Sequence, residues 1–211
     1  FVGEPFKVFY DYKKEGIWQL GEEAAAAANG QEPGDIKVQD VDGNGVITTD
    51  DRIIYSQRPD VTFGFNNTFN YKGFDLSVFL YARLGQWIAY DYNTTYRINA
   101  LENGGNVDYW TPENPTNAFP RPNKSKSYTQ VTYYSTLKYE DGSFFKIRDI
   151  TLGYTFKPEL LKHLNLSRLR VYATAKNFFT FSKIDNYDPE QGGSISFPMT
   201  KQLVFGLNVE F

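Results

Sequence analysis

The chain contains no cysteine among its 211 residues, one histidine and one methionine. The absence of cysteine excludes a disulfide framework and thiolate metal sites. No apolar run approaches 18 residues, so the sequence excludes a transmembrane helix, although a membrane β-barrel needs no such run. A net charge of -3 gives no electrostatic reason to expect nucleic acid as a partner. We interpret the single histidine, His163, as a turn residue and not as a catalytic or metal-binding group.

Apolar and polar residues alternate instead, most regularly at the end of the chain. Leu203, Phe205, Leu207, Val209 and Phe211 are apolar, whereas Gln202, Gly206, Asn208 and Glu210 are polar or small, and only Val204 interrupts the pattern. A strand of about 10 residues with one apolar face is typical of a transmembrane β-barrel. Aromatic residues make up 18% of the chain, which suits the girdles of a barrel or the core of a soluble sandwich.

The same alternation predicts further strands at 62–71, 74–84, 149–156 and 168–182, with a sixth around 6–12. The predicted fold class is therefore all-β, a segment of an antiparallel transmembrane barrel. Six strands cannot close a barrel, because the smallest have about eight. The chain also begins at Phe1 without a targeting segment, so we expect it to be part of a longer protein.

The lengths of the connections predict the orientation of the barrel. Long connections at 13–60, 85–143 and 185–201 alternate with the Lys72-Gly73 turn and a modest link at 157–167. Barrels of the bacterial outer membrane carry long loops outside and short turns in the periplasm. This pattern predicts that the three long connections are extracellular and tolerate truncation, and that Phe211 lies in the periplasm.

The first long connection contains a calcium-loop motif. In the insert 13–60, the EF-hand spacing is filled by Asp40, Asp42, Asn44, Val46 through its carbonyl, Thr48 and Asp51, with Gly45 at the sharp turn. Asp51 replaces the usual glutamate, and Pro33-Gly34 precludes a full entering helix, although a short exiting helix could run through Ser56. The motif predicts a structural Ca²⁺ site; the alternative is an Asp/Gly/Asn turn without metal.

Other candidate groups are weaker. Tyr109 and Trp110 in the longest connection could stack on a sugar or contact a partner, or they could anchor the loop by burial. Acidic pairs such as Asp185 with Asp188, or Asp188 with Glu190, could imitate glycosidase carboxylates, but turn-capping carboxylates are commoner. We therefore expect no enzyme activity.

Several ordered segments resemble the C-terminal part of SusC/RagA-type TonB-dependent outer-membrane transporters. They are Gly16-Ile17-Trp18-Gln19, Pro33-Gly34-Asp35-Ile36-Lys37, Tyr109-Trp110-Thr111-Pro112-Glu113-Asn114-Pro115-Thr116-Asn117, Asp141-Gly142-Ser143-Phe144-Phe145-Lys146-Ile147-Arg148, Leu152-Gly153-Tyr154-Thr155, Lys176-Asn177-Phe178-Phe179-Thr180 and Tyr187-Asp188-Pro189-Glu190. The resemblance covers nearly the whole chain. Neither a plug nor a TonB-contacting segment is recognisable in it.

The resemblance implies a Gram-negative outer-membrane barrel of about 22 strands. It further implies an upstream plug that engages TonB, a SusD-like surface lipoprotein as partner, and oligosaccharide or peptide fragments as cargo for import. Two other classes stay open from the residues alone, a secreted calcium-stabilised β module that binds carbohydrate and a soluble hydrolase. Dependence on detergent or lipid would distinguish the membrane transporter from both of these other classes.

Overall fold

The computed structural model describes residues 1–99 and 104–211, which fall into two compact units. The loop unit comprises Phe1–Arg58, Trp87–Asp141 and Gly192–Ile195, and the sheet unit comprises Pro59–Gln86, Gly142–Gln191 and Ser196–Phe211. Within the described ranges, no helix has the length and apolar character required to cross a membrane.

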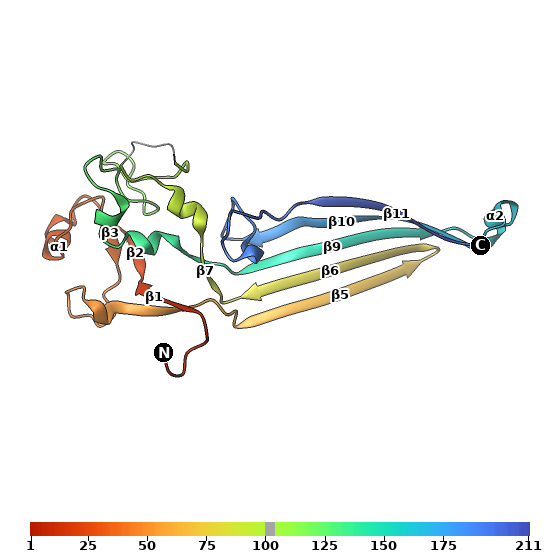
Figure 1. Cartoon of the computed structure of the whole chain (residues 1–211), viewed down its shortest axis with the longest axis horizontal. Helices are drawn as coiled ribbons and strands as arrows, with labels where there is room; N and C mark the ends of the chain where they lie inside the picture. The colour runs from red at the N-terminus through yellow and green to blue at the C-terminus, as the bar shows by residue number, and fades with distance from the viewer. Residues whose placement is uncertain (100–103) are drawn as a thin grey trace. The chain divides into compact units, whose positions relative to one another are not determined.

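The sheet unit is built on five long antiparallel strands. They are β5 (Val61–Tyr71), β6 (Phe74–Leu84), β9 (Phe144–Thr155), β10 (Arg168–Ser182) and β11 (Gln202–Glu210). They lie side by side in the order β11-β10-β9-β6-β5 (Figure 1). The helix α2 (Pro158–Leu161) and a 3-10 helix (Lys162–Leu164) link β9 to β10, and a second 3-10 helix (Pro189–Gln191) precedes β11. These strands confirm the predicted all-β architecture.

The strand register places the predicted apolar residues on one face. Leu207 is opposite Val171, Val171 is opposite Tyr154, and Tyr154 is opposite Phe74. Large side chains on this face are open to solvent, including Leu152 at 52% and Phe205 at 77% exposure. An apolar face of this kind is unusual for a water-soluble protein and suits contact with lipid.

The opposite face is polar and carries cross-strand pairs. Arg170 forms an ion pair with Asp75, joining its Nη2 to Oδ2 at 2.5 Å across the intervening β9. The hydroxyls of Thr151 and Thr174 lie 2.8 Å apart. The alternation of the sequence therefore becomes two chemically different faces of one sheet.

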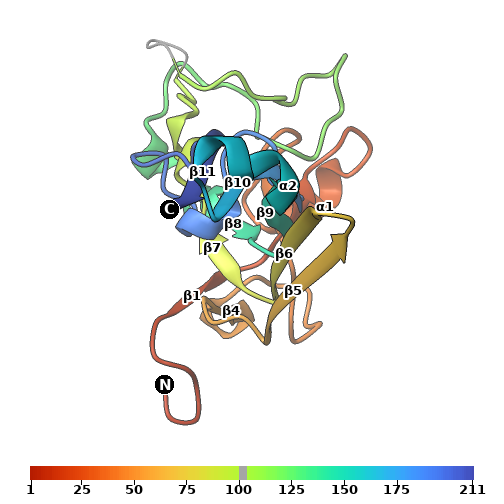
Figure 2. The ribbon, with the colours of Figure 1, turned by 90° about the vertical axis from the view of Figure 1, so that its right-hand side faces the viewer.

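Short and long connections leave opposite ends of the sheet. At one end, Lys72 and Gly73 have positive φ values of 48° and 91° and form a two-residue turn of the kind that suits a hairpin. A Cβ at Gly73 would lie 2.8 Å from the Thr155 carbonyl oxygen, so glycine is required there. The segment with α2 closes β9 to β10 at this same end, which faces the viewer in Figure 2. The connections 85–143 and 183–201 leave the other end.

The loop unit contains three short antiparallel strand pairs. They join β1 (Val8–Tyr12) with β4 (Arg52–Ser56), β2 (Lys14–Ile17) with β3 (Ile36–Val38), and β7 (Trp87–Ala89) with β8 (Tyr139–Asp141). The helix α1 (Glu23–Ala28) and 3-10 helices at Thr49–Asp51, Asp91–Thr95, Tyr128–Gln130 and Tyr134–Lys138 complete it. Its core packs Ile17, Ile36, Val38, Trp110 and Leu137 together.

The predicted strand at 6–12 forms as β1, but it pairs with β4 and not with the long sheet, which therefore has five strands where six were expected. The alternation of β1 does not specify a partner strand. Packing does so, because Tyr55 of β4 lies against Tyr139 at 5.0 Å and Trp87 at 4.8 Å between ring centroids. Tyr55 also donates a hydrogen bond to the Tyr12 carbonyl at 2.8 Å.

Candidate functional site

The calcium-loop motif folds into a tight turn in which three carboxylates converge. One oxygen from each of Asp40, Asp42 and Asp51 lies within 4.8 Å of the others. Asp51 is fully buried, and its two oxygens accept hydrogen bonds from the backbone N–H groups of Thr48 and Val41, each at 2.7 Å. These hydrogen bonds, that from Thr48 above all, hold the pKa of Asp51 below its ordinary value. Asp51 is therefore fixed as a carboxylate.

The remaining side chains of the loop cap its backbone. Asp40 accepts the N–H groups of Gly43 and Gly45 at 2.8 and 2.7 Å. Asn44 Oδ1 accepts the N–H of Val46 at 2.8 Å, and Thr48 Oγ1 accepts that of Asp50 at 3.2 Å. The predicted exiting helix does not form, because β4 begins at Arg52 directly after a single 3-10 turn. The capping hydrogen bonds would also stabilise a metal-free turn.

The donor set of this loop fits a hard cation. Calcium binds oxygens at about 2.3 to 2.6 Å, so two ligands on opposite sides of the ion lie about 5 Å apart. The three carboxylates meet this spacing. The structure thus brings together Asp40, Asp42 and Asp51, whereas Asn44 and Thr48 present their side-chain oxygens to backbone N–H groups.

Tyr109 and Trp110 have different environments. Trp110 is 4% exposed within the core of the loop unit, and its Nε1 donates a hydrogen bond to Gln19 Oε1 at 2.9 Å. Tyr109 is 43% exposed. Trp110 thus acts as an anchor of its loop, and only Tyr109 is placed to contact a cargo or partner. His163 is exposed in the 3-10 helix Lys162–Leu164.

Two of the transporter-like sequence segments, 141–148 and 187–190, meet in a buried ion-pair cluster on the polar face of the sheet. Lys146 has a fully buried side chain, and its Nζ contacts Asp188 at 2.7 Å and Glu190 at 2.8 Å. Arg148 contacts the other oxygen of Glu190 at 3.1 Å. The two acidic residues are therefore occupied by cations and do not form a glycosidase-like pair. The cluster joins β9 to the β10–β11 loop, and it was not predicted from the sequence.

A signal for this cluster is present in the sequence. Lys146 and Arg148 alternate with Phe145 and Ile147, and Asp188 and Glu190 stand two residues apart in the loop between β10 and β11. Opposite charges with matching spacing indicate a pair. Because Lys146 and Asp188 are 42 positions apart, sequence spacing alone could not join them.

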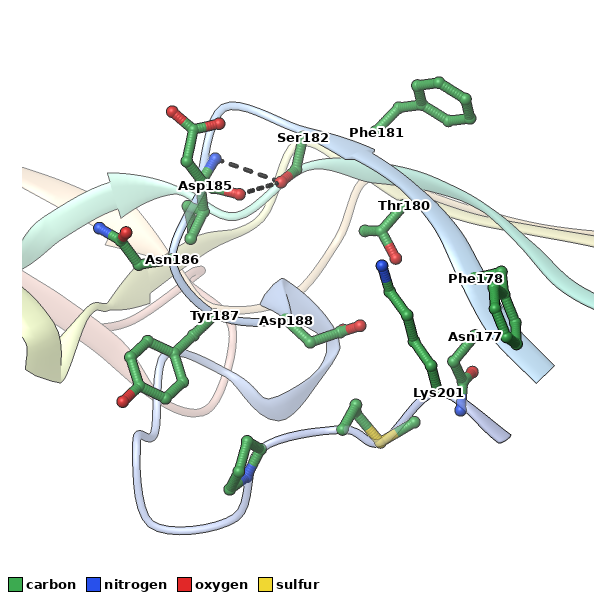
Figure 3. Close-up of a pocket in the computed structure, with 13 residues that line it drawn as sticks. Asn177, Phe178, Thr180, Phe181, Ser182, Asp185, Asn186, Tyr187, Asp188 and Lys201 are labelled. Atoms are coloured by element: carbon green, nitrogen blue, oxygen red, sulfur yellow. Dashed lines mark hydrogen bonds between the residues drawn. The ribbon is translucent and has the colours of Figure 1, made fainter. Parts of the chain in front are cut away.

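A cavity of about 740 Å³ lies beside this cluster, at the end of the sheet with the long connections. The last residues of β10 form one wall, and the β10–β11 loop forms the other (Figure 3). Its lining combines Phe178, Tyr187 and Met199 with amide, hydroxyl and charged groups from Asn177, Thr180 and Lys201. The volume falls within the range of small-ligand sites, and the lining is more polar than is usual for them.

The chain is similar in sequence to TonB-dependent receptors. No family model matches the chain. It is 31% identical to TonB-dependent receptor P3 of Formosa agariphila, in an alignment that covers 99% of the chain and 22% of that receptor. It is also 31% identical to TonB-dependent receptor SusC of Bacteroides thetaiotaomicron, which it matches over 82% of the chain and 17% of that receptor. The chain spans about a fifth of the length of these relatives.

The similarity extends to a solved structure. The RagAB peptide transporter superposes with a TM-score of 0.71 at 24% sequence identity, over 97% of this chain and 23% of that one. At this identity the match shows a shared fold alone, an all-β barrel segment.

Proposed function

We propose that this chain forms one section of the wall and outer loops of an outer-membrane nutrient importer. It is part of a TonB-dependent receptor of the SusC/RagA type. The observation that carries the proposal is the sheet itself. It combines an exposed apolar face, with Leu207 at 68% exposure, and an opposite face lined by ion pairs. A barrel wall between lipid and an aqueous lumen requires this division.

The strand ends support an orientation. The long connections 85–143 and 183–201 leave one end of the sheet, and the Lys72-Gly73 turn closes the other. We place the long connections outside the cell and Phe211 in the periplasm, following the asymmetry of outer-membrane barrels. The extracellular loops would then meet a SusD-like lipoprotein, and TonB would act through a plug elsewhere in the receptor.

The calcium loop would serve this surface as a structural element. Asp40, Asp42 and Asp51 would bind the ion directly, with Asn44, the Val46 carbonyl and Thr48 supplying further oxygens after small rotations. Bound Ca²⁺ would neutralise three carboxylates that otherwise repel one another in one short turn. The ion would fix the insert 13–60 without taking part in any reaction.

The cargo belongs to one of two chemical classes, oligosaccharides or peptides, since SusC/RagA-type transporters import both. The experiment deletes the full receptor gene and supplies neutral oligosaccharides, uronate-containing oligosaccharides or peptides as the sole nutrient. We expect growth to fail on one class and to be restored by the full receptor together with its adjacent lipoprotein. Equal growth of deletion and parent strains on all three classes would refute import.

A further inference from the structure

The cavity beside β10 contains a cation with no counter-charge. Lys201 directs its Nζ into the cavity toward Thr180 (Figure 3). Within the described ranges, no carboxylate lies within ion-pair distance of this amine, and the Thr180 hydroxyl has no hydrogen-bond partner. An ammonium and a hydroxyl that face the same space are two donors for an anionic group.

The acidic residues of the lining do not cancel this charge. Asp188 faces the cavity, but both of its oxygens accept hydrogen bonds from Lys146, at 2.9 and 2.7 Å. The four charges of Lys146, Arg148, Asp188 and Glu190 sum to zero. Asp185 lies on the far side, and its carboxylate points away from Lys201 (Figure 3). The unpaired charge beside Lys201 and Thr180 is therefore positive.

The backbone of β10 beside the cavity departs from regular β-structure. Asn177 has a left-handed φ of 58° and lies in a β-bulge between Lys176 and Phe179. Its Oδ1 is buried and has no hydrogen-bond partner in the described part of the chain. Bulges, left-handed residues and unsatisfied buried polar atoms are each costly and gather at functional sites.

We propose that this cavity is a cargo subsite that binds a carboxylate group, with Lys201 and Thr180 as donors to the anion. Phe178 supplies an apolar wall for the attached ring or chain. The inference rests on the proposed import function and narrows its substrate class to carboxylate-bearing fragments. Two sources share this chemistry, a uronate unit of an acidic glycan and the C-terminal carboxylate of a peptide.

The experiment uses the full receptor, expressed with its lipoprotein in the deletion strain, and measures initial uptake at low concentration. Four probes are compared: oligogalacturonate, neutral galacto-oligosaccharide, a peptide with a free C-terminus and the same peptide as its amide. We expect uptake of one charged probe to exceed that of its neutral counterpart about tenfold or more. In Lys201→Gln this preference should be lost, whereas Lys201→Arg should retain it. The charged probe that shows the effect identifies the source.

Asp185→Asn is the matched control, because it removes a charge from the same cavity without touching the anion donors. It should leave the preference unchanged, and heat-modifiability should confirm that all variants form barrels. Receptor-dependent uptake with no charge preference, or a preference that survives in Lys201→Gln, would overturn the subsite while leaving import intact. Absence of receptor-dependent uptake for every probe would overturn both proposals.

Discussion

At the scale of single residues, the polar face is shaped by glycine as much as by charge. Tyr172 of β10 pairs with Gly206 of β11, and a Cβ at Gly206 would lie 2.2 Å from the tyrosine ring. The ring therefore lies over the glycine, an arrangement that covers the exposed backbone and fixes strand register. Gly153 is similarly covered by the Arg170 guanidinium, which is held in place by Asp75.

A charge introduced on the apolar face of the sheet should destabilise the protein more than a charge on the polar face. Leu207→Arg or Val78→Arg places a charge on the apolar face and should lower the free energy of unfolding in a bilayer by about 2 to 4 kcal/mol. Asn208→Arg, on the opposite face of the same strand as Leu207, should cost much less. Urea titration of the full receptor in vesicles measures the difference. Equal losses at positions 207 and 208 would contradict the assignment.

At the scale of elements, the buried cluster clamps the β10–β11 loop to β9. Lys146→Met would leave Asp188 and Glu190 without their shared cation, and breaking a buried pair from one side typically costs about 3 to 5 kcal/mol. We expect either this loss of stability or release of the loop, seen as faster proteolysis and amide exchange within 183–201.

Lys176→Met is the matched control for this clamp. Lys176 pairs with Asp149 at 3.3 Å on the same sheet, but the two side chains are 45% and 31% exposed. Solvent screens such a pair, so its loss should cost about 1 kcal/mol or less. If the two lysine variants proved equally stable and equally resistant to protease, the clamp would have no structural role.

The loop proposed to bind calcium is a second element whose contribution to stability can be measured. Millimolar Ca²⁺ should protect the insert 13–60 from proteolysis, and chelation should remove the protection without unfolding the barrel. Asp40→Ala should abolish the effect of calcium, because it removes one of the three converging carboxylates. Asp50→Asn, an exposed neighbour outside the ligand set, should respond like the parent. Protection that is independent of calcium would favour the metal-free turn.

At the scale of the whole molecule, the long connection 85–143 contributes side chains to the core of the loop unit. Trp110 is part of the loop-unit core, Phe119 packs against that core, and Asn117 accepts a hydrogen bond from the Ile17 N–H at 3.0 Å. The sequence predicted that long connections tolerate truncation, but these contacts make residues 104–123 part of the hydrophobic core. The sheet unit has its own strand ladder and does not use them.

Deleting 104–123 should therefore unfold the loop unit while the barrel remains assembled. Amide exchange at β2 and β3 should rise strongly, and heat-modifiability should persist. Tyr109→Ala removes an exposed side chain and should leave the fold intact, so it alone tests whether this loop contacts the lipoprotein or cargo. Unchanged exchange in the deletion would show that the core does not depend on this segment.

The long strands, their two faces and the barrel class could be predicted from the sequence, because a period of two is a local property that each strand carries in its own residues. The spacing of Asp40, Asp42, Asn44, Val46, Thr48 and Asp51 lies within one loop and predicted a calcium site, which stays a prediction. No pattern in the sequence showed that β1 pairs with β4, that Trp110 is buried while Tyr109 is exposed, or that Lys146 binds Asp188. Each of these contacts links segments 40 or more residues apart, and their pairing depends on packing and charge across the folded chain, which no local pattern specifies.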